Sequence, residues 1–386
     1  MKGEHFMKFG LFILLGMVLF SLSSTYGEEL KGVPFPPLIH SLRFSTPLTF
    51  CDEGVPIEIQ DIGERLEKEL LISLWDRPQV ILWLKRSTRY LPLIERMLKE
   101  AKLPDDLKYI AIAESALRPH VSSNEGAIGF WQFMKDTGRR YGLTINGHMD
   151  ERRNLFASTG AAIRYFEDLY RRLGSWTLAA AAYNMGEEGL EAEILEQGTN
   201  AYYQLYLPIE TQRFIFRILS VKLICSDPER YGFYLSEDDY YPPLEFDRIH
   251  LNVVQDTPIR IVAQAAQTHF KVIKDLNPEI RGHYLTKGSH SILIPKGSAE
   301  DFDSRFRDLF TRWVETKKEI IYVVKKGDNL SLIADRFNVP LAALLIWNEL
   351  DLKAHIYPGD RLIIYRRELK PSKTEKAAAG ECKEDL

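Results

Sequence analysis

The period of the apolar residues changes part-way along the chain, and this change constrains the fold more than any other feature of the sequence. From about residue 59 to 224 apolar residues recur at helical intervals, beginning with Ile59, Ile62, Leu66 and Leu70. Turn and acidic residues between 227 and 243 then mark a boundary by composition. Two modules of under fifty residues follow, each with the pattern strand, helix, helix, strand. We therefore expect an α+β multidomain chain, mainly α at first and then two small βααβ modules.

This pattern predicts the domain organisation. Residues 32–56 are rich in proline and form an irregular lead-in, while the last twenty residues lack apolar periodicity. We expect a signal peptide at 1–27, an extended lead-in and helical region at 28–91, a helical domain at 92–225, a linker at 226–249, a first small module at 250–297, a charged helical linker at 298–319, a second small module at 320–366 and a disordered tail at 367–386.

The N-terminal segment has the pattern of an export signal. Lys2 and Lys8 precede an uncharged run from Phe9 to Leu22, and small residues follow before Glu28. The run is shorter than the ~20 residues that a membrane-spanning helix needs. We expect the chain to be exported to the periplasm or cell envelope. Retention of this segment as an N-terminal anchor is the alternative, so peripheral association with the envelope stays open.

Charge and cysteine content exclude several classes of function. Fifty Lys and Arg residues against 54 Asp and Glu residues give a formal charge of -4, which argues against binding nucleic acid over the whole surface. Cys51, Cys225 and Cys382 form no CxxC pair, and the nine histidines include no HExxH motif. We expect no metal and no cofactor. A neutral polymer remains compatible as a partner.

A single carboxylate lies near the end of a nearly all-apolar helical segment, Leu103 to Leu117. Pro104 and the two aspartates after it are signals of a helix start. On a 3.6-residue period, Glu114 shares a stripe with Leu107, Ile110 and Ala111. Without a cation partner, burial would raise its pKa and keep it protonated near neutral pH, as a general acid requires. The alternative is a glutamate at a solvated helix end.

Two later segments carry residues that suit a carbohydrate ligand. Ser122 to Met134 combines turn residues, two glycines and the aromatic pair Phe130-Trp131. Glycines let backbone approach a ligand closely, and aromatic faces suit the C–H faces of sugar rings. Trp176 to Gly186 predicts a closely packed, alanine-rich helix with Tyr183 projecting near its C-terminus. Core packing is the alternative for these aromatic side chains.

Together these segments resemble the catalytic domain of lytic transglycosylases, a lysozyme-like family that also contains goose-type lysozyme. The resemblance runs from about Pro92 to Ile224. Glu114-Ser115 matches the family's Glu-Ser motif, and Gly126 to Gln132 matches its Gly-Ala-x-Gly-Leu-Met/Trp-Gln motif. Ala182 to Gly186 matches Ala-Tyr-Asn-x-Gly. Three motifs in the right order and spacing are far more specific than any one of them.

The resemblance implies roles for individual residues. Glu114 would protonate the oxygen of the β-1,4 bond between N-acetylmuramic acid and N-acetylglucosamine. It would then take the proton of the muramic C6 hydroxyl, giving a 1,6-anhydro product. Ser123, Gln132 and Tyr183 would hold the acetamido group, orient the acid and line the cleft. The remaining substrate-binding residues would be Phe130, Trp131, Met134 and Asn184.

The second small module resembles a LysM domain, and the first resembles a degenerate copy without the Gly-Asp turn. The resemblance implies binding of N-acetylglucosamine-containing glycan between two loops, with peptidoglycan glycan strands as the partner. The residues of these loops are Gly327, Asp328, Asn329, Leu330, Ile356, Tyr357, Pro358 and Gly359. LysM domains usually have threonine at the position of Asn329. A module that only packs on its neighbour is the alternative.

The leading prediction is therefore a peptidoglycan lytic transglycosylase targeted to the wall by LysM. A hydrolytic muramidase that cleaves the same bond with water is one alternative. A catalytically silent peptidoglycan-binding scaffold, or a spore-coat or adhesion protein, is another. Glu210 is the rival carboxylate to Glu114, although its position at a helix start also suits a capping role.

Overall fold

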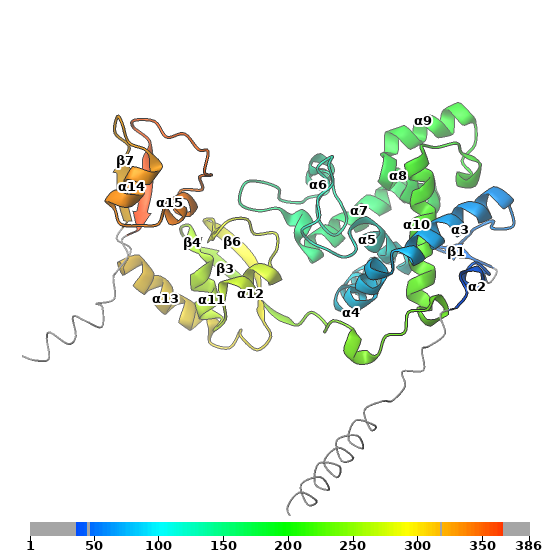
Figure 1. Cartoon of the computed structure of the whole chain (residues 1–386), viewed down its shortest axis with the longest axis horizontal. Helices are drawn as coiled ribbons and strands as arrows, with labels where there is room; N and C mark the ends of the chain where they lie inside the picture. The colour runs from blue at the N-terminus through cyan, green and yellow to red at the C-terminus, as the bar shows by residue number, and fades with distance from the viewer. Residues whose placement is uncertain (1–35, 45–46, 317–318, 366–386) are drawn as a thin grey trace, which may run out of the picture.

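The computed structural model describes residues 36–44, 47–316 and 319–365. Figure 1 shows a helical domain followed by two small modules that each contain a strand pair and short helices. The expected signal peptide at 1–27 and the expected tail at 367–386 lie outside the described residues. The α+β architecture expected from the change of period is present.

The N-terminal region is part of the helical domain and not a separate unit. Helix α2 (Leu38–Ser41) and the antiparallel pair β1 (Thr49–Phe50) and β2 (Glu53–Gly54) precede α3 (Gln60–Trp75) and α4 (Arg77–Glu100). Helix α4 runs unbroken through Pro92, so the boundary expected at 91/92 falls inside a helix. Phe50, Leu70 and Ile94 are fully buried in the same core as the later helices.

The rest of the helical domain is built around α10 (Ile209–Ser226), which packs against α3, α5 and α8. Figure 1 shows α10 running through the middle of this domain. Five buried residues in α8, from Leu178 to Ala182, are mostly alanines, and their small size lets the neighbouring helices approach closely. The other elements are η1 (Asp105–Leu107), α5 (Lys108–Ser115), α6 (Lys135–Arg140), η2 (Glu151–Arg153), α7 (Leu155–Leu173), α8 (Trp176–Met185), α9 (Glu187–Gln197) and η3 (Tyr202–Gln204).

Side-chain caps mark the first turns of α7 and α8. The side chain of Asn154 accepts a hydrogen bond from Ala157 N and starts α7, and Ser175 does the same for α8. Gly174 and Gly186 follow the last residues of these helices with φ of 69° and 91°, which side chains rarely adopt. The helix expected from Trp176 to Gly186 is therefore confirmed to within one residue.

The first small module follows η4 (Glu229–Tyr231) and η5 (Glu237–Asp239). Strand β3 (Phe246–Val253) pairs antiparallel with β6 (Gly288–Pro295), and β4 (Thr257–Pro258) pairs with β5 (Tyr284–Leu285). Helices α11 (Ile259–Ala265) and α12 (Phe270–Leu276) lie between them. Helix α13 (Phe302–Thr316) buries Phe302, Phe306 and Trp313 in the core of this module. The segment expected to be a charged helical linker is mostly helical, but it packs on the module as a third helix.

The second small module has β7 (Glu319–Val323), α14 (Leu330–Arg336), α15 (Leu341–Trp347) and β8 (Arg361–Tyr365), with β7 and β8 antiparallel. A buried cluster around Ile333, Leu344 and Ile364 forms its core. Within the described ranges no single helix is long and apolar enough to cross a bilayer. Helices α14 and α15 pass that test only as a pair, bent by 106°.

In each small module, an asparagine that follows the second helix makes the same set of hydrogen bonds to the last strand. Asn277 donates to the carbonyl four residues earlier and to Leu293 O (2.8 Å), and accepts from Leu293 N (2.8 Å). Asn348 donates to the carbonyl four residues earlier and to Ile363 O (2.9 Å), and accepts from Ile363 N (2.6 Å). We infer from this shared network that the two modules are copies of one fold.

Candidate active site

Glu114 lies half-buried in the last turn of α5. Burial raises the pKa of its carboxyl group to about 8, Arg217 opposes this shift, and the charge of Glu210 adds to it. The carboxyl group makes no hydrogen bond to another residue in the described part of the chain. A carboxyl group with this pKa is protonated at neutral pH and can act as a general acid.

Arg217 is the cation that sequence reasoning missed. It lies on α10, half-buried, on a helix that packs against α5. The periodicity of α5 could only show that no cation shares the helical stripe of Glu114. The charge of Arg217 keeps the pKa of Glu114 lower than burial alone would make it.

The end of α5 is tied to the loop that follows it. Ala116 and Leu117 both have positive φ, 53° and 57°, although neither is glycine. The hydroxyl of the buried Ser115 donates to Phe130 O (2.8 Å), and Arg86 donates to Ala116 O (3.2 Å). Ser115 thus anchors the backbone next to Glu114, the residue expected to act as the acid. Such sparsely populated backbone conformations often persist at functional sites.

The segment from Val121 to Met134, here called the motif loop, is held by a network of backbone contacts. Isolated bridges join Ile128 to Ser122 and to Phe133. A Cβ atom on Gly129 would lie 1.9 Å from Arg152 O, and its φ is 87°, so only glycine fits there. Gln132 has a φ of 47°, and its amide donates to Gly129 O (2.9 Å) and Val121 O (3.2 Å).

Ser123 closes a turn within the motif loop. Its hydroxyl oxygen accepts from Glu125 N and from Ala127 N, both at 3.2 Å. Its side chain is half-buried. The hydroxyl hydrogen is left to donate to a ligand while the oxygen fixes the loop, which is compatible with the expected role in holding an acetamido group.

Arg152, paired with Asp150, holds the motif loop through hydrogen bonds, and the sequence pattern did not indicate either residue as part of the site. Arg152 binds both carboxylate oxygens of Asp150 at 2.9 Å, and both side chains are buried. Its remaining nitrogen donates to Gly126 O (3.0 Å) and Phe133 O (3.1 Å), at the two ends of the glycine motif. A bidentate pair that also donates to two backbone carbonyls fixes the geometry of the loop strongly.

Tyr183 lies near the end of α8 and is close enough to Glu114 for the two groups to interact electrostatically. Its hydroxyl donates to Trp131 O (2.6 Å), and its ring stacks on Phe166 at 4.7 Å. Burial raises its pKa well above its usual value, and the charge of Glu114 adds to this effect. Tyr183 therefore stays protonated, and its hydroxyl keeps the backbone of the motif loop in place next to Glu114.

Phe130 and Trp131 correct an expectation. Both rings are buried in the core, at 2% and 0% exposure, and the indole nitrogen of Trp131 donates to Thr159. No ring face is exposed for a sugar to stack on, so Phe130 and Trp131 can affect a cleft only by supporting the residues that line it. Met134 is 45% exposed and is available to a ligand.

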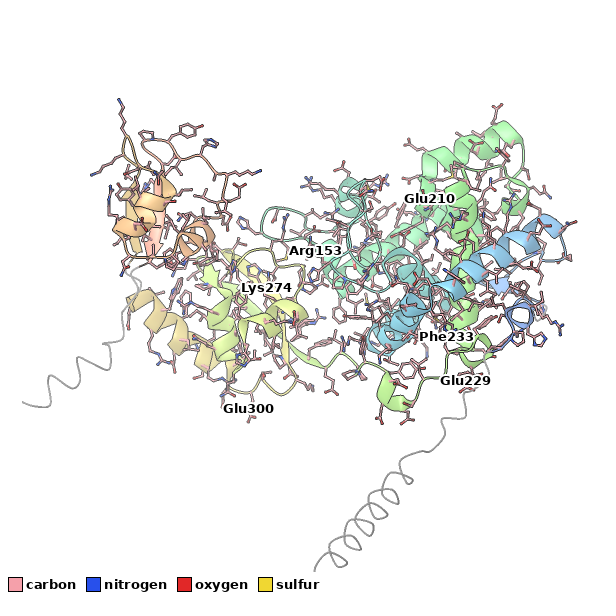
Figure 2. The ribbon with its side chains drawn as sticks, in the orientation of Figure 1. Arg153, Glu210, Glu229, Phe233, Lys274 and Glu300 are labelled. Atoms are coloured by element: carbon pink, nitrogen blue, oxygen red, sulfur yellow. The ribbon has the colours of Figure 1, made fainter. Side chains whose placement is uncertain are left out.

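Asn184 and Glu210 lie where α8 meets the start of α10. The side-chain oxygen of Asn184 accepts from Thr211 Oγ1 (2.9 Å), which ties the two helices together. Glu210 is exposed in the first turn of α10, and its charge raises the pKa of Glu114. Figure 2 labels Glu210 near the start of α10.

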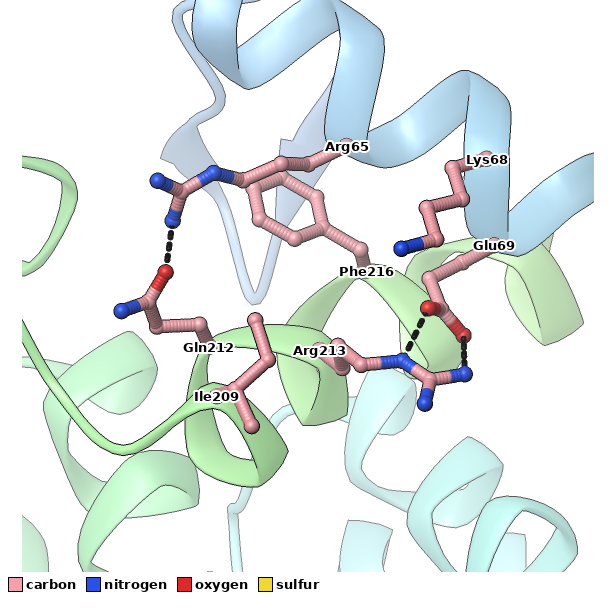
Figure 3. A pocket seen from close by; sticks show the side chains of 7 residues that line it. All are labelled: Arg65, Lys68, Glu69, Ile209, Gln212, Arg213 and Phe216. Carbon is pink, nitrogen blue, oxygen red and sulfur yellow. Dashed lines mark hydrogen bonds and ion pairs between the residues drawn. The ribbon is translucent and has the colours of Figure 1, made fainter.

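Arg213 and neighbouring residues of α10 pack against α3. A small pocket of about 90 Å³ lies there. Figure 3 shows the side chains that line it, among which Arg213 pairs with Glu69 (2.5 Å) and Arg65 bonds to Gln212. These contacts hold α3 against α10 and so support the helix that carries Arg217.

The loops expected to bind glycan in the second small module come together. Asp328 accepts from Tyr322 Oη (2.6 Å) and Lys325 N (2.8 Å), and Asn329 caps α14 by accepting from Leu332 N. Asn329 thus performs the capping that a threonine could also provide. Val324, which follows β7, donates to Asp360 O and accepts from Gly359 N, so the end of the second loop is held three residues before the first loop begins. Tyr357 in the second loop is 66% exposed.

Comparison with known proteins agrees with this organisation. A model of the transglycosylase SLT domain matches residues 92–205, and a model of the LysM domain matches residues 322–364. The chain is 30% identical over 295 residues to membrane-bound lytic murein transglycosylase D of Escherichia coli K12 and, equally, of E. coli O6:H1. The alignment covers 72% of this chain and 64% of each relative, so the chain spans slightly less than two thirds of their length.

A solved structure also aligns with part of the chain. The 70 kDa soluble lytic transglycosylase of E. coli is 20% identical with a TM-score of 0.31, over 42% of this chain and 27% of that one. A likeness this weak adds nothing to the two domain matches. The chain thus contains a transglycosylase SLT domain at residues 92–205 and a LysM domain at residues 322–364.

Proposed function

We propose that this chain is a lytic transglycosylase of peptidoglycan. It cleaves the β-1,4 bond between N-acetylmuramic acid and N-acetylglucosamine and leaves a 1,6-anhydromuramic end. The observation that carries this proposal is Glu114: a carboxyl group with a pKa of about 8, within the family's Glu-Ser motif and beside its Tyr-Asn motif.

One carboxyl group serves both steps of this reaction. Protonated Glu114 gives its proton to the glycosidic oxygen as the C1–O bond breaks. The resulting carboxylate takes the proton of the C6 hydroxyl, whose oxygen bonds to C1. The charge that forms on Glu114 between these steps is stabilised by Arg217.

The surrounding residues position the substrate. Ser123 offers a hydroxyl proton to an acetamido oxygen, and Gln132 and Tyr183 hold the backbone of the motif loop around it. Asn184 holds α8 against α10 next to the acid. The LysM domain keeps the enzyme on its polymeric substrate and so raises the local concentration of glycan strands. Action on the wall places the protein in the periplasm or cell envelope.

Mass spectrometry of digested peptidoglycan tests the proposal. We expect products that end in 1,6-anhydromuramic acid, lighter by one water than the products of hydrolysis. Reducing-end products throughout would show a hydrolytic muramidase instead. Release of no products by the wild-type chain would leave a peptidoglycan-binding scaffold.

The matched controls are Glu114→Gln and Glu210→Gln. The first removes the acid, and we expect it to abolish product formation. The second removes the other nearby carboxylate, and we expect it to lower the pKa of Glu114 with activity retained. Loss of activity in Glu210→Gln alone would assign the acid to Glu210.

A further inference from the structure

The first small module is docked firmly on the helical domain beside the motif loop. Ile280 forms a β-bridge with Met149, and Asp150 N donates to Glu279 O (2.8 Å). The side chain of Asn154 donates to Glu279 Oε1 (2.8 Å). Arg281 N donates to His148 O (2.8 Å), so the backbone of Arg281 is fixed against the helical domain.

A pocket of about 460 Å³ lies at this junction. Lys135 and Arg139 of α6 line it, together with Arg153 of η2 and Arg281 from the module. Ile128 of the motif loop also lines it, so the pocket borders the loop that carries Ser123 and Gln132. Figure 2 shows Arg153 at the junction between the two domains.

The charges of these four basic residues are not compensated within the pocket. Asp150 is the one acidic lining residue, and Arg152 occupies both of its oxygens. Within the described ranges, Lys135 and Arg281 form no ion pair. Arg139 donates to Ile145 O (2.7 Å). Arg153 contacts His120 at 3.4 Å, and its Nε is buried without a hydrogen-bond partner.

A neutral sugar backbone does not require such a pocket. Arginine forks and lysine ammonium groups recognise carboxylates, and an unpaired buried guanidinium nitrogen is costly unless a ligand accepts from it. Peptidoglycan carries carboxylates on the peptide stem that extends from the lactyl group of muramic acid. The volume is within the range of pockets that hold small ligands.

We propose that this two-domain pocket binds the carboxylates of the peptide stem on a muramic residue of the bound strand. The inference rests on the proposed function for the identity of the strand. It gives the first small module a role that does not need a glycan groove of its own: it supplies Arg281 and closes one side of the stem site.

Binding of defined glycan strands tests the proposal. The parent is the full chain with Glu114→Gln, which prevents turnover during the measurement. Strands with intact stems and strands stripped of stems by an amidase are titrated at low salt. We expect the parent to bind the stem-bearing strands more tightly. The double variant Lys135→Ala/Arg281→Ala should reduce this preference by roughly tenfold, because two charge contacts are lost.

The control is Lys287→Ala, which removes an exposed charge from the same module outside the pocket. We expect it to keep the parent's preference. Equal affinity of the parent for both strands would overturn the proposal, as would an equal loss on both strands in the double variant. Binding of inorganic phosphate but not of free stem peptide, abolished by the double variant, would make this a phosphate site and also overturn it.

Failure of the proposed function has a different signature. If the wild-type chain forms no anhydro products while the parent still prefers stem-bearing strands, the stem site stands and the lyase does not. Circular dichroism of each variant shows that the fold is retained, which we expect because Lys135 and Arg281 are exposed.

Discussion

Replacing Glu114 by glutamine should abolish activity and at the same time stabilise the fold in a pH-dependent way. Burial raises the pKa of Glu114 from 4.5 to about 8. Between these values the folded state holds a proton that the unfolded state has released, so the folded state becomes less stable as pH rises from 4.5 to 8. Glutamine is neutral at every pH and avoids this cost.

The size of the effect follows from the same two values. Each pKa unit corresponds to 1.36 kcal/mol, so the full difference amounts to about 5 kcal/mol at pH 8 and above. At pH 7 the cost is about 3 kcal/mol, and at pH 4.5 it is close to zero. No hydrogen bond within the described part of the chain is lost on substitution, so the gain should appear in full.

Thermal unfolding from pH 4.5 to 8.5 measures this directly. We expect equal melting temperatures for wild type and Glu114→Gln at pH 4.5, and a variant melting roughly 5–10 °C higher at pH 7. Wild-type kcat/KM should fall above about pH 8, as the acid loses its proton. A difference in melting temperature that does not change with pH would refute the assignment of Glu114 as a buried acid with a raised pKa.

Three further substitutions have definite expected outcomes. Gly129→Ala places Cβ 1.9 Å from Arg152 O, so it should lower the free energy of unfolding by more than about 3 kcal/mol and remove most of the activity. The control Gly54→Ala, whose Cβ meets nothing within 4 Å, should leave the free energy of unfolding nearly unchanged. Denaturant titration of both variants measures the difference. Burial raises the pKa of Glu279 to about 7, so the folded state loses stability as pH rises from 4.5 to 7. Glu279→Gln should therefore have a higher melting temperature than wild type at pH 8 but not at pH 4.5. Equal melting temperatures of the two proteins at both pH values would contradict this. Asn348→Ala breaks three hydrogen bonds and should destabilise the LysM domain by about 2–3 kcal/mol and weaken its binding to sedimented cell wall. An unchanged melting curve would contradict this and show that water replaces these hydrogen bonds.

Local patterns predicted a large share of this protein. The 3.6-residue period placed Glu114 on a buried stripe of α5. Short strand and helix signals predicted the strand, helix, helix, strand order of the second small module, and of β3, α11, α12 and β6 in the first, but not the pair β4 and β5. Turn chemistry predicted the end of α8 at Gly186. These features depend on neighbours within a few residues, so a single sequence contains the information that determines them.

Two expectations failed for a shared physical reason. The segment at 298–319 is charged and looked like a linker, but α13 buries three aromatic rings against the first module. Trp131 suits a sugar by its chemistry, yet the structure buries its ring against Phe166 and bonds its nitrogen to Thr159. Whether an aromatic side chain faces solvent or core depends on partners far away in the sequence.

The sequence by itself determined which chemical groups are present: an acid in an apolar helix, a glycine-rich loop and a LysM module whose loops are expected to bind glycan. Only the tertiary structure decided how that chemistry is tuned. Arg217 acts on Glu114 from another helix, Arg152, paired with Asp150, holds the motif loop through hydrogen bonds, and Arg281 reaches the junction from another module. Charges and hydrogen bonds act through space, and the sequence does not reveal which distant residues folding brings within reach of one another.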